Sequence, residues 1–244
     1  MTPKLQWRKI GNVNIFEYQG VFSEPSVKQN EKEMSYILHS HPSKGLLFNL
    51  RLLEKLDHSA VELILETTRQ AKKSAILGHN LSSYFIAEHM RPNEAVPFFD
   101  EADEAIDFFE EELAELTPEE KNLEEKRYFP RIKTALPVKF EIKNENGKLA
   151  FQAVVLNLSE GGLYGRFLDS HTEELAKRAV DPFDLKMLSV RLRLPDSQLL
   201  KLNGKILRTQ KEFSPPSGFA LEFYQLEAWE RQQIVHFLEK EHAE

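Results

Sequence analysis

The sequence predicts a protein of two domains, an α/β layer fold followed by a six-stranded antiparallel β-barrel with a closing C-terminal helix. Strand-like and helix-like segments alternate through the first 113 of the 244 residues. Acidic residues then dominate a short stretch, and beyond residue 131 short strands with turn signals follow one another. We therefore divide the chain into an α/β domain at 1–113, an acidic linker at 114–125 and a barrel domain at 126–244.

The first half is expected to alternate strands and helices. Extended segments are predicted at 11–18, 45–50, 74–77 and 96–99, and helices at 27–38, 82–89 and 101–113. The clearest helix follows residue 58. Ser59 and Glu62 fit a capping box, and Val61, Ile64 and Leu65 recur at helical spacing. The pattern predicts Ser59 as the residue that caps this helix.

Charge is distributed unevenly along the chain, whose net formal charge is -7. Residues 1–125 carry 13 basic and 23 acidic side chains, and residues 126–244 carry 19 basic and 16 acidic ones. The stretch 100–125 alone holds 13 acids and one base, Lys121. An acidic half repels nucleic acid, and the second half is too weakly basic to follow a polyanion. We expect a small anionic ligand and no nucleic-acid partner.

Composition excludes several other classes. The chain has no cysteine, so disulfides and thiolate metal sites are excluded. No apolar run is long enough to span a membrane, so a cytoplasmic protein without membrane insertion is expected. His39 and His41 fit a loop better than a metal site, and no phosphate-binding loop, zinc-protease helix or nucleophile elbow occurs. We expect no metal, no redox cofactor and no enzyme activity.

The second half has the pattern of a small barrel. Strands are predicted at 138–142, 151–156, 162–167, 187–194, 199–208 and 218–223, separated by turn signals such as Asn146-Gly147. A helix is expected at 226–240, with Leu226, Ile234, Phe237 and Leu238 on one face. That apolar face would cover the barrel.

Two arginines flank the start of the barrel domain. Arg127 and Arg131 lie four residues apart around Pro130, which disfavours regular helix. Arginine pairs bidentately with guanine, stacks on purines and binds phosphate. Two such side chains can enclose one compact guanine nucleotide, although a pair of solvated surface charges is the alternative interpretation.

A polar turn follows one of the predicted strands. Asn157 and Ser159 are two residues apart and share a side of the strand end, and Gly161 and Gly162 allow the backbone to turn and to approach a ligand closely. The alternative is an ordinary turn, since Asn, Ser and Gly are common in turns.

Together, these segments resemble the signature of the PilZ family, which is Arg-x-x-x-Arg followed about twenty to thirty residues later by Asp/Asn-x-Ser-x-x-Gly. The matching positions are Arg127, Arg131, Asn157, Ser159 and Gly162. The likeness extends over roughly 126–240, through the strands at 202–208 and 218–223 and the terminal helix.

This resemblance implies a six-stranded barrel that binds cyclic di-GMP. It places Arg127 and Arg131 over guanine and phosphate, and Asn157 and Ser159 against the other guanine edge. Arg208 and Lys126 are further candidate ligand residues by position, and Arg208 also suits an exposed strand position.

The first half is similar to STAS domains, the fold of anti-sigma factor antagonists. The likeness rests on the order of strands and helices and on the sequence Asp57-His58-Ser59-Ala60 at a helix start. The family's loop commonly reads Asp-Ser-Ser-Gly and is phosphorylated on its second serine, which corresponds to Ser59. His58 and Ala60 depart from that pattern, in place of its first serine and its glycine.

We therefore expect a cyclic di-GMP receptor or adaptor whose STAS-like half contacts an unidentified protein partner. The alternative is an interaction protein that binds no ligand and acts through the STAS-like half in a partner-switching pathway. The sequence leaves open the partner, the physiological output, self-association and the binding of one dinucleotide or a stacked pair.

Overall fold

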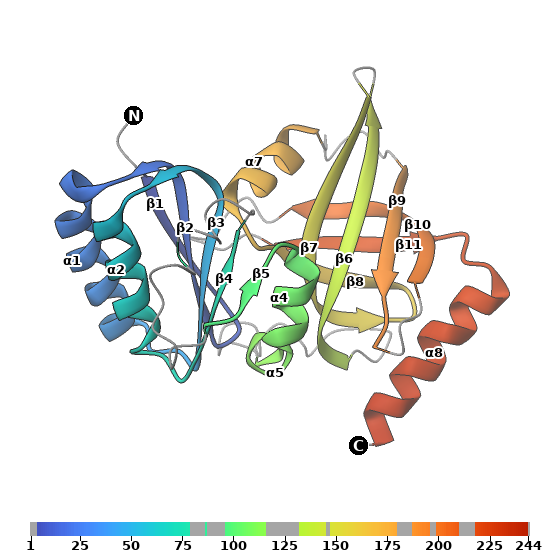
Figure 1. Ribbon diagram of the computed structural model, residues 1–244. Coiled ribbons are helices and arrows are strands. Elements are labelled where there is room, and N and C mark those ends of the chain that lie inside the picture. The colour runs from blue at the N-terminus through green and yellow to red at the C-terminus, as the bar shows by residue number, and fades with distance from the viewer. Residues whose placement is uncertain are drawn as a thin grey trace. The chain divides into compact units, whose positions relative to one another are not determined.

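The computed structural model divides into two compact units, Met1–Glu112 and Leu113–Glu244, each of which we describe by itself (Figure 1). The residues it describes are 4–78, 86, 96–115, 132–144, 147–179, 187–195, 199–209 and 218–243. The prediction of an α/β layer fold followed by a six-stranded antiparallel barrel with a C-terminal helix is confirmed.

The first unit is a five-stranded sheet in the order β1-β2-β3-β4-β5. Strand β1 is antiparallel to β2, and the other neighbours are parallel. Its elements are β1 (Lys4–Ile10), β2 (Val13–Phe22), α1 (Glu24–Ser40), β3 (Gly45–Leu56), α2 (His58–Thr68), β4 (Lys73–Leu77), β5 (Phe98–Phe99), α4 (Ala102–Phe108) and α5 (Glu110–Ala114).

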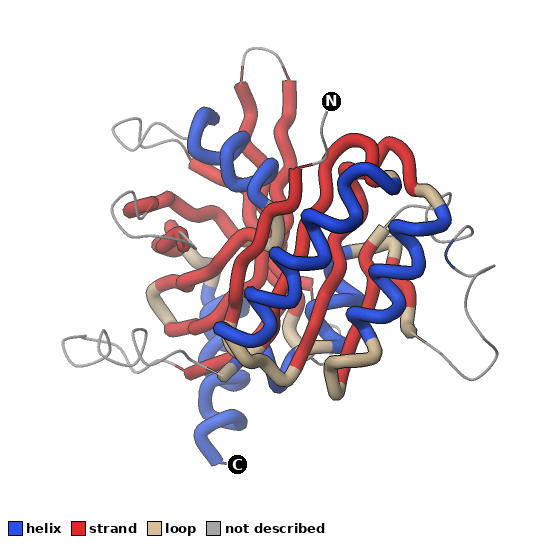
Figure 2. The backbone as a smooth tube through the Cα atoms, turned by 90° about the vertical axis from the view of Figure 1, so that its left-hand side faces the viewer, coloured by secondary structure: helices blue, strands red, loops and turns tan. Residues whose placement is uncertain are grey.

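Helices cover both faces of this sheet. The crossovers from β2 to β3 and from β3 to β4 join parallel strands, and such crossovers are almost always right-handed, which puts α1 and α2 on one face. Figure 2 shows α1 and α2 side by side in front of the strands, and Figure 1 shows α4 on the opposite face. The layers therefore run helix, sheet, helix.

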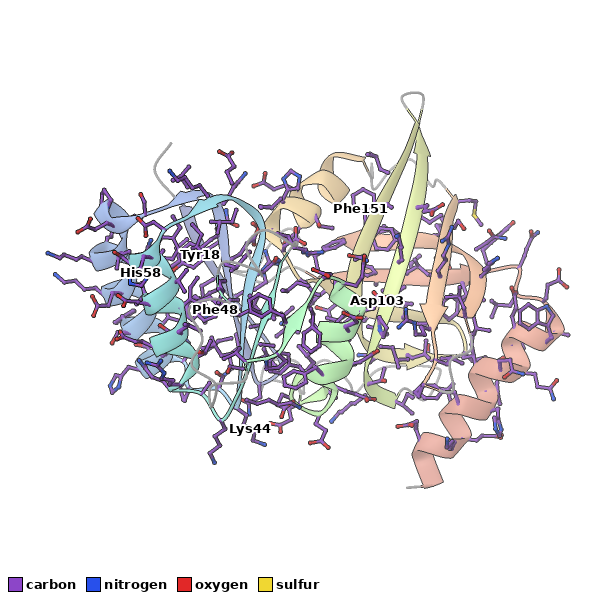
Figure 3. All side chains as sticks on the ribbon, viewed as in Figure 1. Tyr18, Lys44, Phe48, His58, Asp103 and Phe151 are labelled. Atoms are coloured by element: carbon purple, nitrogen blue, oxygen red, sulfur yellow. The ribbon has the colours of Figure 1, made fainter. Side chains whose placement is uncertain are left out.

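Aromatic side chains fill the space between the sheet and α1 and α2. Tyr18 and Phe48, which are labelled in Figure 3, are fully buried, and Tyr18 stacks on Phe22 with ring centroids 4.2 Å apart. The Tyr18 hydroxyl donates to the sulfur of Met34 at 2.8 Å. Burial raises the pKa of Tyr18 far above its ordinary value, and the Glu33 carboxylate adds to this rise.

The N-terminal hairpin differs from the sequence prediction. The strand predicted at 11–18 is β2, which begins at Val13, because Gly11 adopts a positive φ of 55° in the turn after β1. Strand β1 itself was not predicted. Basic residues interrupt the apolar residues of this strand, so the sequence does not show an alternating pattern there. In the structure, Trp7 pairs with Phe16 of β2.

The predicted helix at 101–113 is two short helices, α4 and α5. Helical geometry stops at Phe109, whose fully buried ring packs against the backbone of β3. A Cβ at Gly45 would lie only 2.9 Å from that ring, so glycine makes room for it. The helix predicted at 82–89 lies outside the described residues except for Ile86, which is helical and buried.

The prediction that Ser59 caps the helix is wrong, because the capping residue of α2 is Asp57. One carboxylate oxygen of Asp57 accepts from the Ala60 N–H at 3.0 Å. The other accepts from the Glu24 N–H, at the start of α1, at 2.7 Å. Both helices begin at the same end of the parallel sheet, so one carboxylate stabilises two helix N-termini. Ser59 is the second residue of α2 and is half-buried.

The second unit is a closed barrel in the strand order β10-β11-β8-β7-β6-β9, and every neighbouring pair is antiparallel. Its elements are β6 (Ile132–Asn144), β7 (Gly147–Ser159), β8 (Gly162–Phe167), α7 (Ser170–Ala179), β9 (Met187–Arg193), β10 (Leu199–Thr209), β11 (Gly218–Tyr224) and α8 (Ala228–Ala243). Helix α7 was not predicted. It begins where Asp169 accepts from the Thr172 N–H at 2.6 Å.

The barrel encloses a continuous apolar core. Phe140 packs against Phe151, Phe167 and Phe219, with ring centroids 5.2 to 5.9 Å apart. Helix α8 adds Ile234, Phe237 and Leu238 to this core, as its predicted apolar face implies. Within the described parts of both units, no helix is both long and apolar enough to cross a membrane.

The shared cap at Asp57 generates a stability prediction. Asp57→Ala removes hydrogen-bond acceptors from α1 and α2 together, so we expect the free energy of unfolding of the first unit to fall by about 1–3 kcal/mol. Urea unfolding followed by Trp7 fluorescence in a Trp229→Phe background measures it. Asp57→Asn keeps one acceptor and should lose about half as much. The exposed control Glu54→Ala should change little, and an equal loss in this control would contradict the shared cap.

Candidate ligand-binding site

The polar turn predicted as part of the ligand site lies at the tip of the β7–β8 hairpin. Ser159 pairs with Gly162, so Glu160 and Gly161 form a two-residue turn. The Phe223 N–H of β11 donates to the Gly161 carbonyl at 3.0 Å. Glu160 forms an ion pair with Arg231 of α8 at 3.5 Å. Contacts to β11 and α8 therefore hold the turn in place.

A bulge in β7 decides which way the polar residues face. Ala153 and Val155 point into the barrel core, and strict alternation would send Asn157 inward as well. The pairing with β8 shifts by one residue between Val155 and Asn157, which leaves Leu156 as an extra residue. Leu158 consequently points into the core, and Asn157 and Ser159 face outward.

Asn157 and Ser159 are brought together on this outer face, as expected from their spacing. Both are buried within the strand surface, with exposed fractions of 9% and 4%. The Ser159 hydroxyl donates to the Gly162 carbonyl at 3.1 Å. A hydroxyl has one proton and two lone pairs, so this hydroxyl can still accept hydrogen bonds from a ligand.

The structure requires glycine at position 162 for a reason that the sequence did not reveal. A Cβ at this position would overlap the carbonyl oxygen of Leu221 in the neighbouring strand β11. The close approach of two backbones therefore requires glycine here, even though Gly162 is not among the residues with positive φ. Contact between Gly162 and a ligand stays a prediction.

The pairing of strands extends the outer face on both sides of Asn157. Asn157 pairs with Lys133 of β6 and with Tyr164 of β8. Tyr164 pairs with Ala220 of β11, which in turn pairs with Arg208 of β10. The weaker candidate Arg208 thus occupies the same cross-strand row as Asn157, three strands away. Its side chain lies outside the described part of the structure.

Tyr164 is a candidate that the sequence reasoning missed. It is half-exposed on the outer face, and its ring lies over β11, where a Cβ at Gly218 would overlap the ring and its hydroxyl. An aromatic ring beside a polar amide suits a nucleotide base, which stacks on the one and hydrogen-bonds to the other. Only the pairing of β8 with β7 and β11 brings these residues together.

The arginine segment lies outside the described residues, which include none of Lys126, Arg127 and Arg131. The first described residue after it, Ile132, pairs with Leu158, which lies between the two polar residues of β7. Among the described residues no group of histidine and carboxylate side chains suits a metal ion.

The close approach at Gly162 predicts a loss of stability on substitution. Gly162→Ala forces β8 away from the Leu221 carbonyl, so we expect the barrel unit to lose about 1–3 kcal/mol of unfolding free energy without ligand. Urea unfolding followed by Trp229 fluorescence in a Trp7→Phe background tests this. The control Glu160→Ala removes only an exposed ion pair and should cost less than about 1 kcal/mol. Unchanged stability in Gly162→Ala would contradict the backbone contact.

Comparison with known proteins identifies the family of the second half of the chain. Residues 125–240 match the sequence model of the PilZ domain. No curated protein matches the chain in sequence. Among solved structures, the inhibitor of motility MotI (DgrA) of Bacillus subtilis is 17% identical, with 49% of this chain and 52% of that chain covered and a TM-score of 0.37. The aligned region therefore spans about half of MotI.

Two further solved structures resemble one half of the chain each. The PilZ domain of YcgR from Escherichia coli, solved with cyclic di-GMP, is 9% identical over 49% of this chain and 93% of that one, with a TM-score of 0.39. An anti-sigma factor antagonist from Mycobacterium paratuberculosis is 10% identical over 43% and 92%, also with a TM-score of 0.39. The antagonist corresponds to the N-terminal half. With the signature residues and the closed six-stranded barrel, the family match establishes that residues 125–240 of this chain are a PilZ domain.

Proposed function

We propose that this protein is a cyclic di-GMP receptor. Its PilZ domain binds the dinucleotide on the outer face of the β7–β8 hairpin, and its STAS-like unit contacts a protein partner. The observation that carries this proposal is the bulge at Leu156, which turns Asn157 and Ser159 to the outer face together. The chain enters the barrel at the same place, because Ile132 pairs with Leu158.

Chain connectivity supports a role for the arginines. Consecutive Cα atoms are about 3.8 Å apart, so Arg131 directly precedes the point where β6 meets the polar residues of β7. Arg127 is five residues from Ile132, well within reach of a dinucleotide bound there. We assign both guanidinium groups to the guanine and phosphate groups of the ligand. Lys126 and Arg208 are assigned secondary contacts to phosphate.

The polar residues of β7 suit the Watson–Crick edge of guanine. That edge offers N–H donors, and the Ser159 hydroxyl keeps its lone pairs available because its proton is directed to Gly162. The Asn157 amide supplies a donor and an acceptor. The Tyr164 ring provides a surface on which a base stacks. The chemistry is that of binding, so we assign a receptor and adaptor role in the cytoplasm, where such a messenger acts, rather than catalysis.

Isothermal titration with cyclic di-GMP tests the proposal. We expect wild-type protein to bind, and the Arg127→Ala, Arg131→Ala double variant to lose at least about a hundredfold in affinity, since each charged contact contributes roughly 1.5–3 kcal/mol. Tyr164→Ala should weaken binding about tenfold if its ring stacks on a base.

The matched control is Lys28→Ala, Lys32→Ala, which removes two exposed positive charges from α1 of the other unit. It should bind like wild type. No heat with wild-type protein would instead favour the alternative function, an interaction protein that acts without ligand through the STAS-like unit.

We further propose Ser59 as a phosphorylation site that regulates the STAS-like unit. Ser59 is half-exposed, and it is adjacent in sequence to His58, which is exposed. A phosphate there is attracted by the N-terminus of α2 and repelled by the carboxylate of Asp57 two residues earlier. Since that carboxylate also accepts from the first N–H of α1, the modification would act on both helices.

Intact-mass measurement of protein from its native host tests this site. A fraction of the chains should gain the mass of one phosphoryl group, and the gain should disappear in Ser59→Ala. Only unmodified chains across varied growth conditions would contradict the proposal.

A further inference from the structure

Strands β9 and β10 present a cationic outer side. Along both strands buried and exposed residues alternate, so one side chain in two points away from the core. The outward cations here and on the part of β6 that pairs with β9 are Lys139, Arg191, Arg193, Lys201 and Lys205. Two acids lie among them. Glu141 forms an ion pair with Arg191 at 3.0 Å, and the exposed Glu222 of β11 is opposite Lys205.

Three of these cations form a continuous row. Lys139 of β6 pairs with Arg191 of β9, and Arg191 pairs with Lys201 of β10. Residues directly opposite each other in antiparallel strands have Cβ atoms about 5 Å apart, and like charges at that distance destabilise the sheet. The ion pair between Arg191 and Glu141 offsets only part of this repulsion, and binding of an anionic partner would offset more of it.

The same side carries exposed apolar residues. Met187, Leu199 and Leu207 are 44%, 50% and 56% exposed, and Tyr224 of the neighbouring β11 is 46% exposed. These are four of the six large apolar side chains that are exposed among the described residues. Pairing mixes them with polar groups, since Met187 is opposite Lys205, Leu199 opposite Arg193 and Tyr224 opposite Asn203. Arginine, methionine and tyrosine are enriched in protein interfaces.

We propose that this outer side of β9 and β10, the β9–β10 face, is a docking surface for an acidic protein segment with apolar side chains. Charge complementarity defines the acidic part of that partner. The exposed leucines and Met187 define the apolar part, because clustered apolar side chains on a surface mark sites of protein contact. A nucleic-acid backbone would match the cations alone and leave these apolar groups without a counterpart.

The centre of the β9–β10 face lies across the barrel from Asn157 and Ser159, and only Arg208, at the end of β10, belongs to the proposed ligand site as well. In the closed order β10-β11-β8-β7-β6-β9, the pair β9–β10 is opposite the pair β7–β8. A partner on the β9–β10 face therefore leaves the outer ends of β7 and β8 accessible. This surface is distinct from the STAS-like unit and adds a second protein contact to the receptor.

Fluorescence anisotropy with the full chain tests this surface. The probe is a labelled synthetic acidic helix with leucines on one side, and the comparison peptide replaces each leucine by serine. Wild-type protein should bind the leucine peptide at least about tenfold more tightly than the serine peptide. Arg191→Glu, Lys201→Glu and, separately, Leu199→Ser, Leu207→Ser should each weaken binding of the leucine peptide about tenfold or more.

The charge-matched control Lys28→Glu, Lys32→Glu on α1 should bind within about twofold of wild type. Melting temperatures verify that each variant folds, independently of the dinucleotide. The proposal is overturned if wild-type protein fails to bind the leucine peptide at about 1 mM, or if the serine peptide or duplex DNA binds as tightly. It is also overturned if the control loses as much affinity as Arg191→Glu, Lys201→Glu.

Discussion

The bulge at Leu156 determines the character of the barrel's polar surface. In a strand of strict alternation, Asn157 would join Val155 in the core, where an amide without partners is costly. The extra residue reverses the alternation, sends Leu158 inward and keeps the polar residues outside. The proposed ligand site and the apolar filling of this end of the barrel therefore depend on the same local shift. Removing the bulge would damage both at once.

The signature residues at this site also have structural roles. Ser159 donates to the Gly162 carbonyl and so joins the two ends of the turn. Gly162 permits the close approach of β8 to β11. A barrel of this kind therefore has reason to retain serine and glycine even without a ligand. Arg127 and Arg131 lie outside the described residues, so their part in ligand binding stays a prediction.

The sequence predicted the strands well and the irregular features poorly. Alternation of apolar and polar residues marked β9 and the other barrel strands, because half-buried strands must follow that period. The bulge in β7 could not be predicted from the sequence. Leu156 is apolar, and an apolar residue fits the strand equally well with or without a shift in pairing. Asp57 was overlooked as a cap because Ser59 and Glu62 also fit a capping box, and its contact with the Glu24 N–H, thirty-three residues away in sequence, depends on the tertiary fold. Tyr164 likewise becomes a candidate only through its pairing with Asn157.

A closed barrel suits the proposed binding of two kinds of partner. Because the strands close into a ring, each has a neighbour on both sides over part of its length, and the proposed recognition uses outward side chains rather than an added strand. Opposite sides of the ring carry different chemistry, with a polar hairpin tip at β7 and β8 and a mixed cationic and apolar side at β9 and β10. The rigid aromatic core around Phe140 separates them. Coupling between the two would therefore act through strand pairing, by way of β6 and β11, rather than through direct contact.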